Sequence, residues 1–195
     1  MLRNNLIHDV RSHSYGGWGL YTDEGSTDIL IENNVVYRCK SASFHQHYGR
    51  DNIVRNNVFA FGTEHQLMRS REEAHLSFVF TNNVVYFDSG TLLGSTWRND
   101  HFVMDNNVYW NIGAGASGAE ITLAGATLQE WRKRGHDLHS TIADPLFVAP
   151  DKYDFRLQRN SPALHLGFRP IDLSEVGVRR KLKAQVHDTD SINSY

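Results

Sequence analysis

The 195-residue sequence predicts an all-β fold: a right-handed parallel β-helix of about five coils, followed by a short helix and a closing segment. The first observation is an Asn-Asn motif that starts at positions 4, 33, 56, 82 and 106. The second is the composition around it: short segments rich in β-branched and aromatic residues, separated by Gly, Asp, Asn and Ser. The apolar residues lack the spacing of helices, so a period near 24 residues favours stacked strands.

Each repeat predicts the same corner between two strands. Asparagine tolerates the left-handed backbone that a corner needs, and stacked amides can form a hydrogen-bonded ladder. An apolar column precedes the corners, at Leu2, Ile31, Val54, Phe80 and Met104. A polar column of mixed charge follows it, at Arg3, Glu32, Arg55, Thr81 and Asp105. A second apolar column comes after the corners, at Leu6, Val35, Val58, Val84 and Val108.

Beyond the fifth Asn pair the repeat lapses. Thr127 and Glu130 have the spacing of a capping box, which predicts a short helix with Leu128 and Trp131 on one face. Proline-marked turns after this helix predict two short strands that return to the body. We therefore expect β-helix coils over 1–125, a capping helix and closing strands over 126–180, and a mobile tail over 181–195.

The first Asn pair follows Met1 by three residues, so the first coil is expected to be incomplete and to expose a sheet edge. The simplest interpretation is the C-terminal part of a longer β-helix. The alternative is a short protein capped by a second copy, with self-association through the uncapped N-terminal coil.

Composition excludes several classes of function. The net charge of −2 gives no broad electrostatic case for a nucleic-acid partner, and no apolar run is long enough for a membrane span. Cys39 is the only cysteine, which excludes an intramolecular disulfide framework and a cysteine-based zinc site. The first ten residues show no signal peptide.

The strands that precede the long turns predict a face rich in functional groups. We align "GLYTDEG" with "SFHQHYG", "QLMRSRE" and "LLGSTWR". The inward column is then expected to contain Leu20, Phe44, Leu67 and Leu92. Alternation along the strands then directs four side chains outward: Tyr21, Asp23, His45 and His47. Arg69 and Arg71 are expected on the same face one coil farther on. Glu64 and His65 are expected to enter the same strand from its upstream turn. Acids, imidazoles, guanidiniums and aromatic rings therefore converge on one sheet.

The segments "GGWGLYTDEGS", "FHQHYG", "NNVFAFG" and "EHQLMRSR", with "DPLF", "DFRL" and "SPAL" after them, resemble a known group. They resemble the C-terminal half of secreted bacterial β-helix proteins of the pectate-lyase-like superfold, which include glycoside hydrolases with α-L-fucosidase and xylanase or xylosidase activity. The resemblance implies cleavage of plant or algal polysaccharide, with the full-length parent secreted, periplasmic or at the cell surface. The superfold also contains lyases, epimerases, esterases and phage tailspikes.

A glycoside hydrolase needs two carboxyl groups, and we predict Asp23 and Glu64, with His47 available for proton transfer. Asp23 and Glu64 are expected two coils apart, roughly 10 Å along the axis, which suits an inverting pair. The structural alternatives are a turn acid for Asp23 and a solvated loop acid for Glu64.

Further residues are predicted to contact a poly- or oligosaccharide substrate: Trp18, Tyr21, Glu24, His45, Tyr48, His65, Arg69 and Arg71. The alternatives are core packing for the aromatic residues and ion pairs with Glu72 or Glu73 for the arginines. We predict no metal and no cofactor, because His45, His47 and Asp23 lack a firm additional ligand.

Two other functions stay open. In a lyase or epimerase, Arg69 or Arg71 would neutralise a uronate while His45, His47 or Tyr48 removes the C5 proton, and calcium could assist. The third function is a glycan-binding or structural β-helix without catalysis.

Overall fold

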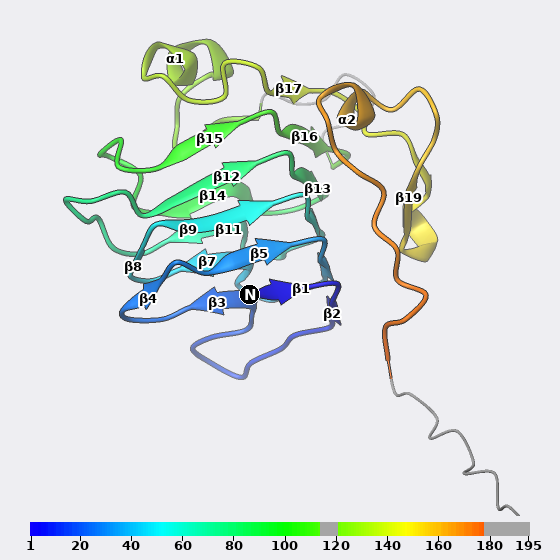
Figure 1. The fold of residues 1–195 in the computed structure, drawn as a ribbon, viewed down its shortest axis with the longest axis horizontal. Coiled ribbons are helices and arrows are strands. Elements are labelled where there is room, and N and C mark those ends of the chain that lie inside the picture. The colour runs from blue at the N-terminus through cyan, green and yellow to red at the C-terminus, as the bar shows by residue number, and fades with distance from the viewer. Residues whose placement is uncertain (114–120, 178–195) are drawn as a thin grey trace, which may run out of the picture.

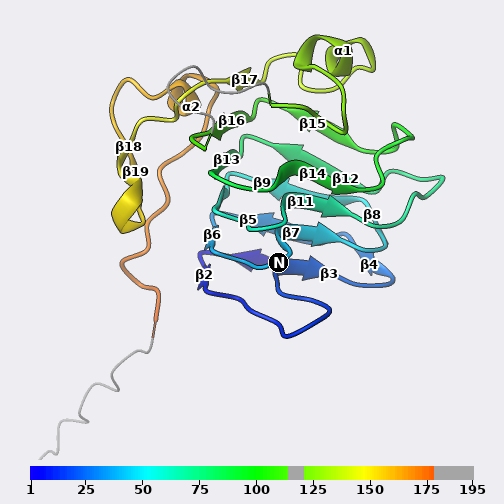
Figure 2. The same cartoon turned by 180° about the vertical axis from the view of Figure 1, so that it is seen from behind.

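The computed structural model describes residues 1–113 and 121–177, so the expected mobile tail over 181–195 lies outside the described residues. The predicted fold is confirmed: the chain is an all-β, right-handed parallel β-helix with two short helices (Figures 1 and 2). It has about four turns, against the expected five coils, and one of its three main sheets contains four strands among the described residues.

Three parallel sheets form the walls of the β-helix. Sheet A contains β1 (Leu2–Arg3), β5 (Leu30–Glu32), β9 (Asn52–Arg55), β12 (Phe78–Thr81) and β15 (Val103–Asp105). Sheet B contains β2 (Leu6–His8), β6 (Val35–Tyr37), β10 (Val58–Ala60), β13 (Val84–Phe87), β16 (Val108–Asn111) and β17 (Thr141–Ile142). Sheet C contains β3 (Trp18–Thr22), β7 (Ala42–Gln46), β11 (His65–Arg69) and β14 (Thr91–Ser95), and a small pair joins β4 (Ser26–Thr27) to β8 (Gly49–Arg50).

The corner between sheets A and B follows the prediction. All three predicted columns stack in register along these sheets. The first asparagine of every pair has φ between 53° and 56°, which is the left-handed region. The second asparagines form the ladder: Asn34 Nδ2 donates to Asn57 Oδ1 at 2.9 Å, and Asn57 Nδ2 donates to Asn83 Oδ1 at 3.0 Å. This ladder holds successive coils at a fixed register.

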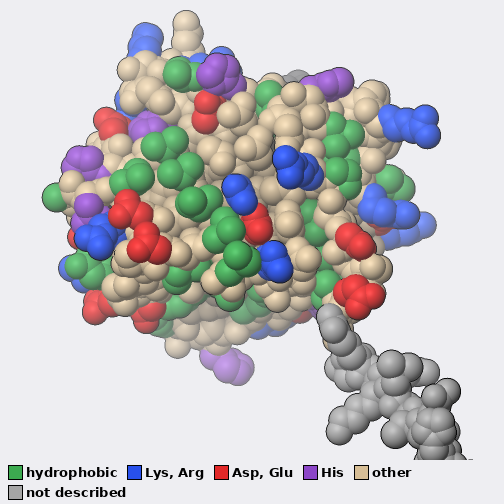
Figure 3. Space-filling view, in the orientation of Figure 1, with side chains coloured by type: hydrophobic (Ala, Val, Ile, Leu, Met, Phe, Trp, Pro, Cys, Tyr) green, Lys and Arg blue, Asp and Glu red, His purple; other side chains and the backbone are tan. Residues whose placement is uncertain are grey.

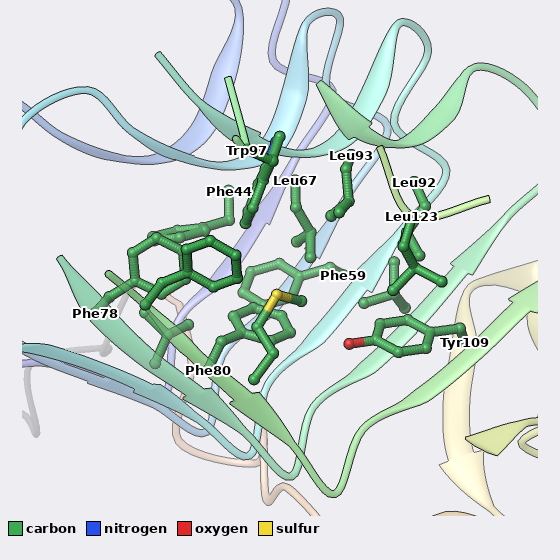
Figure 4. Close-up of a cluster of buried hydrophobic side chains, with 14 of the residues drawn as sticks. Phe44, Phe59, Leu67, Phe78, Phe80, Leu92, Leu93, Trp97, Tyr109 and Leu123 are labelled. Carbon is green, nitrogen blue, oxygen red and sulfur yellow. The ribbon is translucent and has the colours of Figure 1, made fainter. Parts of the chain in front are cut away.

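Aromatic and aliphatic side chains from all three sheets fill the interior (Figure 4). Phe59 of sheet B and Phe80 of sheet A stack with ring centroids 5.7 Å apart. The inward column of sheet C contains Leu20, Phe44, Leu67 and Leu93. Leu93 therefore replaces the expected Leu92 in that column, since β11 and β14 pair Leu67 with Leu93, although both leucines are buried.

The predicted helix is present as α1 (Leu128–Lys133), and Thr127 and Glu130 form its capping box. Trp131 is fully buried and stacks on Phe102, with ring centroids 5.7 Å apart, so the helix covers one end of the interior. The two predicted closing strands are also present, as the antiparallel pair β18 (Phe147–Ala149) and β19 (Asp154–Leu157).

The closing segment covers the outer surface of sheet B (Figure 1). Besides its strands it contains the 3-10 turn Pro150–Lys152 and the helix α2 (Pro162–His165). The Val35 column faces outward, and it is buried against Phe147, Phe155 and Phe168 rather than in the interior. A cavity of about 520 Å³ remains between this column and the closing segment. Sheet B is therefore packed on both faces, and the outer surface of sheet C is not covered by this segment.

Features of the surface and of the helices bear on which partners the protein could bind. Acidic and basic side chains are interspersed over the visible face in Figure 3, as the near-neutral composition indicates. The residues that the structure describes include no helix long and apolar enough to cross a membrane. Met1, Leu2 and Leu6 are exposed on the N-terminal coil, and self-association there stays a prediction.

Candidate functional site on the outer face of sheet C

Two adjacent columns of side chains cross the outer face of sheet C, and we call them together the sheet C face. The first column contains Tyr21, His45, Met68 and Gly94, which are register partners. The second contains Asp23, His47, Ser70 and Thr96, whose backbone hydrogen bonds continue the same register. Neighbouring coils lie about 4.8 Å apart, so side chains in one column can contact directly.

An aromatic stack occupies the first column. Trp18 and Tyr21 have ring centroids 4.7 Å apart, and Tyr21 lies 4.9 Å from His45 with nearly parallel rings. Tyr15 contacts the edge of Trp18 from the preceding loop, at 5.0 Å. Trp18 and Tyr21 are half-buried, whereas His45 is only 1% exposed. The expected direct contact between His45 and substrate is therefore wrong, because the two larger rings cover the imidazole.

Ser70 lies between two histidines of the preceding coil. Its Oγ is 2.7 Å from His45 Nε2 and 2.8 Å from His47 Nδ1. Burial lowers the pKa of His45 to about 4, so this imidazole is neutral at pH 7. The other ring nitrogen of His45, Nδ1, is buried and has no hydrogen-bond partner. The two imidazoles thus hold one hydroxyl in a fixed position.

Asp23 is exposed at the end of β3, where its Oδ1 accepts two hydrogen bonds. The backbone N–H of Glu24 donates at 2.8 Å and the hydroxyl of Tyr21 donates at 2.9 Å. These two bonds, the backbone one first, hold the pKa of Asp23 below its usual value, so the carboxylate is ionised at neutral pH. Burial, and then the bond to Asp23, raises the pKa of Tyr21, which excludes this phenol as a base.

Glu24, Tyr48 and Arg71, three of the residues predicted to contact substrate, lie together beside the second column. Glu24 Oε1 is 3.2 Å from Arg71 Nη1 and 3.6 Å from His47 Nε2. The Arg71 guanidinium lies over the ring of Tyr48, 4.9 Å from its centroid. Glu73 is 3.9 Å from Arg71, so the expected alternative of an ion pair is also present. Glu24 and Arg71 are largely exposed, which leaves both able to contact a ligand.

Arg69 does not belong to the sheet C face. It is in register with Thr22 and Gln46, which point into the β-helix, and it is fully buried. Its Nη2 donates to Asn99 Oδ1 at 2.7 Å, and its guanidinium lies 5.1 Å from the centroid of Phe102. The predicted role in gripping a uronate is therefore wrong, because alternation along β11 turns this side chain inward.

Glu64 lies at the opposite end of sheet C from Asp23. Its backbone N–H donates to Lys40 O, and its Oε2 accepts from Ser41 Oγ at 2.8 Å. Glu64 is therefore level with Ser41, whereas Asp23 is level with His47, six residues farther along the same coil. At the rise of a strand, six residues separate the two carboxyl groups by about 20 Å along the strand direction. The expected separation of roughly 10 Å is wrong, because it considered only the stacking direction. The two carboxyls cannot act as a pair.

His65 also lies toward the upstream end of sheet C. Its Nδ1 is 2.8 Å from Thr91 Oγ1, and a side chain at Gly94 would collide with its ring. Among residues 1–113 and 121–177, no group of three His, Cys, Asp or Glu side chains is arranged to hold a metal. His45, His47 and Asp23 therefore form no metal site within the described chain.

Ser70 is the site residue that sequence reasoning missed. Its signal was present, because the alignment of "SFHQHYG" with "QLMRSRE" places Ser70 directly beside His47. The site was instead assigned to the arginines on either side of it, Arg69 and Arg71. No protein-family model, curated protein or solved structure matches the chain. What this face does must therefore be inferred from its own geometry.

Proposed function

We propose that this chain is a carbohydrate-active protein that binds a polysaccharide across the sheet C face and cleaves its glycosidic bonds. The observation that carries the proposal is the run from the Trp18–Tyr21 stack directly to the ionised carboxylate of Asp23. A sugar ring combines an apolar C–H face with a rim of hydroxyl groups, so it fits an aromatic platform next to a hydrogen-bond acceptor. The resemblance to β-helix glycoside hydrolases supports the same substrate class.

Glycosidic cleavage needs one group that acts as base or nucleophile and one that protonates the leaving oxygen. The lowered pKa of Asp23 suits the first role. Glu64 is too distant for the second, so we assign proton transfer to His47, which is level with Asp23 on the next coil. Glu24 Oε1 lies 3.6 Å from His47 Nε2, on the side of the ring away from Ser70.

The test is turnover of a polysaccharide and aryl-glycoside panel by wild type, by Asp23→Asn and by the matched control Asp28→Asn. Asp28 is an exposed aspartate with φ of 56°, a conformation that asparagine accepts. We expect Asp23→Asn to lower kcat at least about 100-fold with an unchanged melting temperature, and the control to keep full activity. Equal activity in all three proteins would remove Asp23 from the mechanism.

A uronate lyase is the second candidate, favoured by Arg71 beside His47 through their shared contact with Glu24. Arg71 would neutralise the carboxylate of the sugar and His47 would take the C5 proton. A new near-ultraviolet absorbance from the unsaturated product distinguishes this reaction from hydrolysis, and its calcium dependence can be measured alongside. Glycan binding with neither product would indicate the non-catalytic function.

A further inference from the structure

We propose that Ser70 is a nucleophile for acyl transfer, with His47 as its base, so that the sheet C face cleaves esters carried by its carbohydrate substrate. Ser70 Oγ is within hydrogen-bond distance of His47 Nδ1, and Glu24 lies on the far side of that ring. A hydroxyl, an imidazole and a carboxylate in this order form the arrangement that activates serine in hydrolases.

The two histidines determine which way the serine proton points. A hydroxyl has one proton, so Ser70 can donate to only one of the two imidazoles, and at least one of them must donate to its oxygen. Glu24 Oε1 lies 3.6 Å from His47 Nε2, beyond hydrogen-bond distance, but its negative charge attracts the N–H dipole of a ring that carries its proton on Nε2. The neutral His47 ring then presents a bare Nδ1 to the serine, and His45 Nε2–H donates to Ser70 Oγ. The serine proton is directed at His47.

His45 and Glu24 are positioning residues in this arrangement. The N–H of His45 would stabilise negative charge on the serine oxygen, and its burial keeps this donor in place. Glu24 orients His47 and stabilises the imidazolium that forms when the proton arrives. Arg71 contacts the same Glu24 oxygen and so helps to hold that carboxylate beside His47.

The reaction balances without any further reagent except water. Ser70 Oγ attacks the carbonyl carbon of the ester while its proton moves to His47 Nδ1. The bond from that carbon to the alcohol oxygen breaks, and His47 returns the proton to the departing alcohol. Water then attacks the acyl-serine, again with His47 as base, and releases the carboxylic acid and free Ser70. The assignment of a carbohydrate as the carrier of the ester rests on the proposed function.

The experiment treats the full chain with a fluorophosphonate probe, which reacts covalently with activated serines, and locates the label by peptide mapping. We expect one labelled serine, Ser70, together with turnover of p-nitrophenyl acetate and of an acetylated polysaccharide. His47→Gln should slow labelling about 100-fold or more, as expected for loss of a general base. Ser89→Ala, at an exposed serine outside this face, should label at the wild-type rate.

Labelling of folded wild type anywhere but Ser70, or nowhere, overturns the proposal, and this result does not depend on whether a variant folds. So does labelling of Ser70 at the same rate in His47→Gln. Glycan affinity, measured on the same samples by calorimetry, separates this outcome from failure of the proposed function. Labelling at Ser70 without glycan binding keeps the nucleophile and removes the carbohydrate as its substrate.

Discussion

Two stacked columns of polar side chains run along this β-helix, and they differ in how they repeat. At the corner between sheets A and B, every coil supplies the same residue, and each amide donates to the next. On the sheet C face, the second column changes its residue at each coil, through Asp23, His47, Ser70 and Thr96.

The difference separates scaffold from site. A repeated asparagine satisfies the polar groups of its neighbours and fixes the register, which needs one side chain with both a donor and an acceptor. A column of unlike residues does not form such a chain, and it places a carboxylate, an imidazole and a hydroxyl at one position of successive coils. Coil stacking thus provides both rigidity and chemistry, at different positions of one repeat.

Breaking the ladder at its centre should have the largest effect. Asn57→Ala removes the acceptor for the backbone and side-chain N–H groups of Asn34, and the donor to Ile31 O. The backbone N–H of Asn34 then stays buried without this acceptor, and Asn34 Nδ2 keeps only its bond to Leu2 O, so we expect a loss of about 3–5 kcal/mol in the free energy of unfolding. Urea denaturation followed by circular dichroism measures it.

The matched control is Asn5→Ala at the end of the same ladder. Asn5 donates to Asn34 but accepts from no described amide of a preceding coil, and it is half-buried. We expect a loss of about 1 kcal/mol. Equal losses at Asn5 and Asn57 would mean that the amides act independently, and that the ladder is not a cooperative support.

The second prediction concerns pH and the sheet C face. Burial lowers the pKa of His45 from 6.5 to about 4, so the His45 imidazole binds a proton more tightly in the unfolded chain than in the folded one. Stability from this residue is present above pH 6.5 and is lost as pH falls toward 4. We expect wild type to lose about 2 kcal/mol more than His45→Gln between pH 7 and pH 4.5.

Denaturation at both pH values measures this difference. His13→Gln is the control, because His13 is exposed on the loop before β3 and its imidazole reaches water in both states. That variant should follow the wild type. The same acid loss in His45→Gln as in wild type would show that the buried imidazole is not the group responsible.

The corner could be predicted from the sequence and much of the site could not, for a physical reason. The Asn motif marks the same point of every coil, so residues counted from it stack in register, as Ile31 on Val54 and Glu32 on Arg55. Sheet C has no such marker. The turns that lead into its strands differ in length, and an error of one residue exchanges inside for outside.

The individual outcomes follow from this contrast. Tyr21, Asp23 and His47 were placed on one face correctly, because the alignment pairs Leu20 with Phe44, as the structure does. Arg69 was placed outside and lies inside. The distance between Glu64 and Asp23 was estimated only along the axis of the β-helix, although their positions along the strands determine it. Counting residues along a strand, as well as coils, corrects such errors.

The smallest effect is expected for the polar column beside the ladder, on the solvent side of sheet A. Arg55 and Glu32 form an ion pair at 2.8 Å, as the mixed charges of the column predicted. Arg55 is about half exposed, and exposed pairs contribute little because water and salt screen them. Arg55→Gln should therefore cost no more than about 0.5–1 kcal/mol, measured by urea denaturation at low ionic strength, and less in 1 M salt. A loss that persists in salt would assign the Arg55 side chain a packing role, and the column would then belong to the scaffold as firmly as the asparagines do.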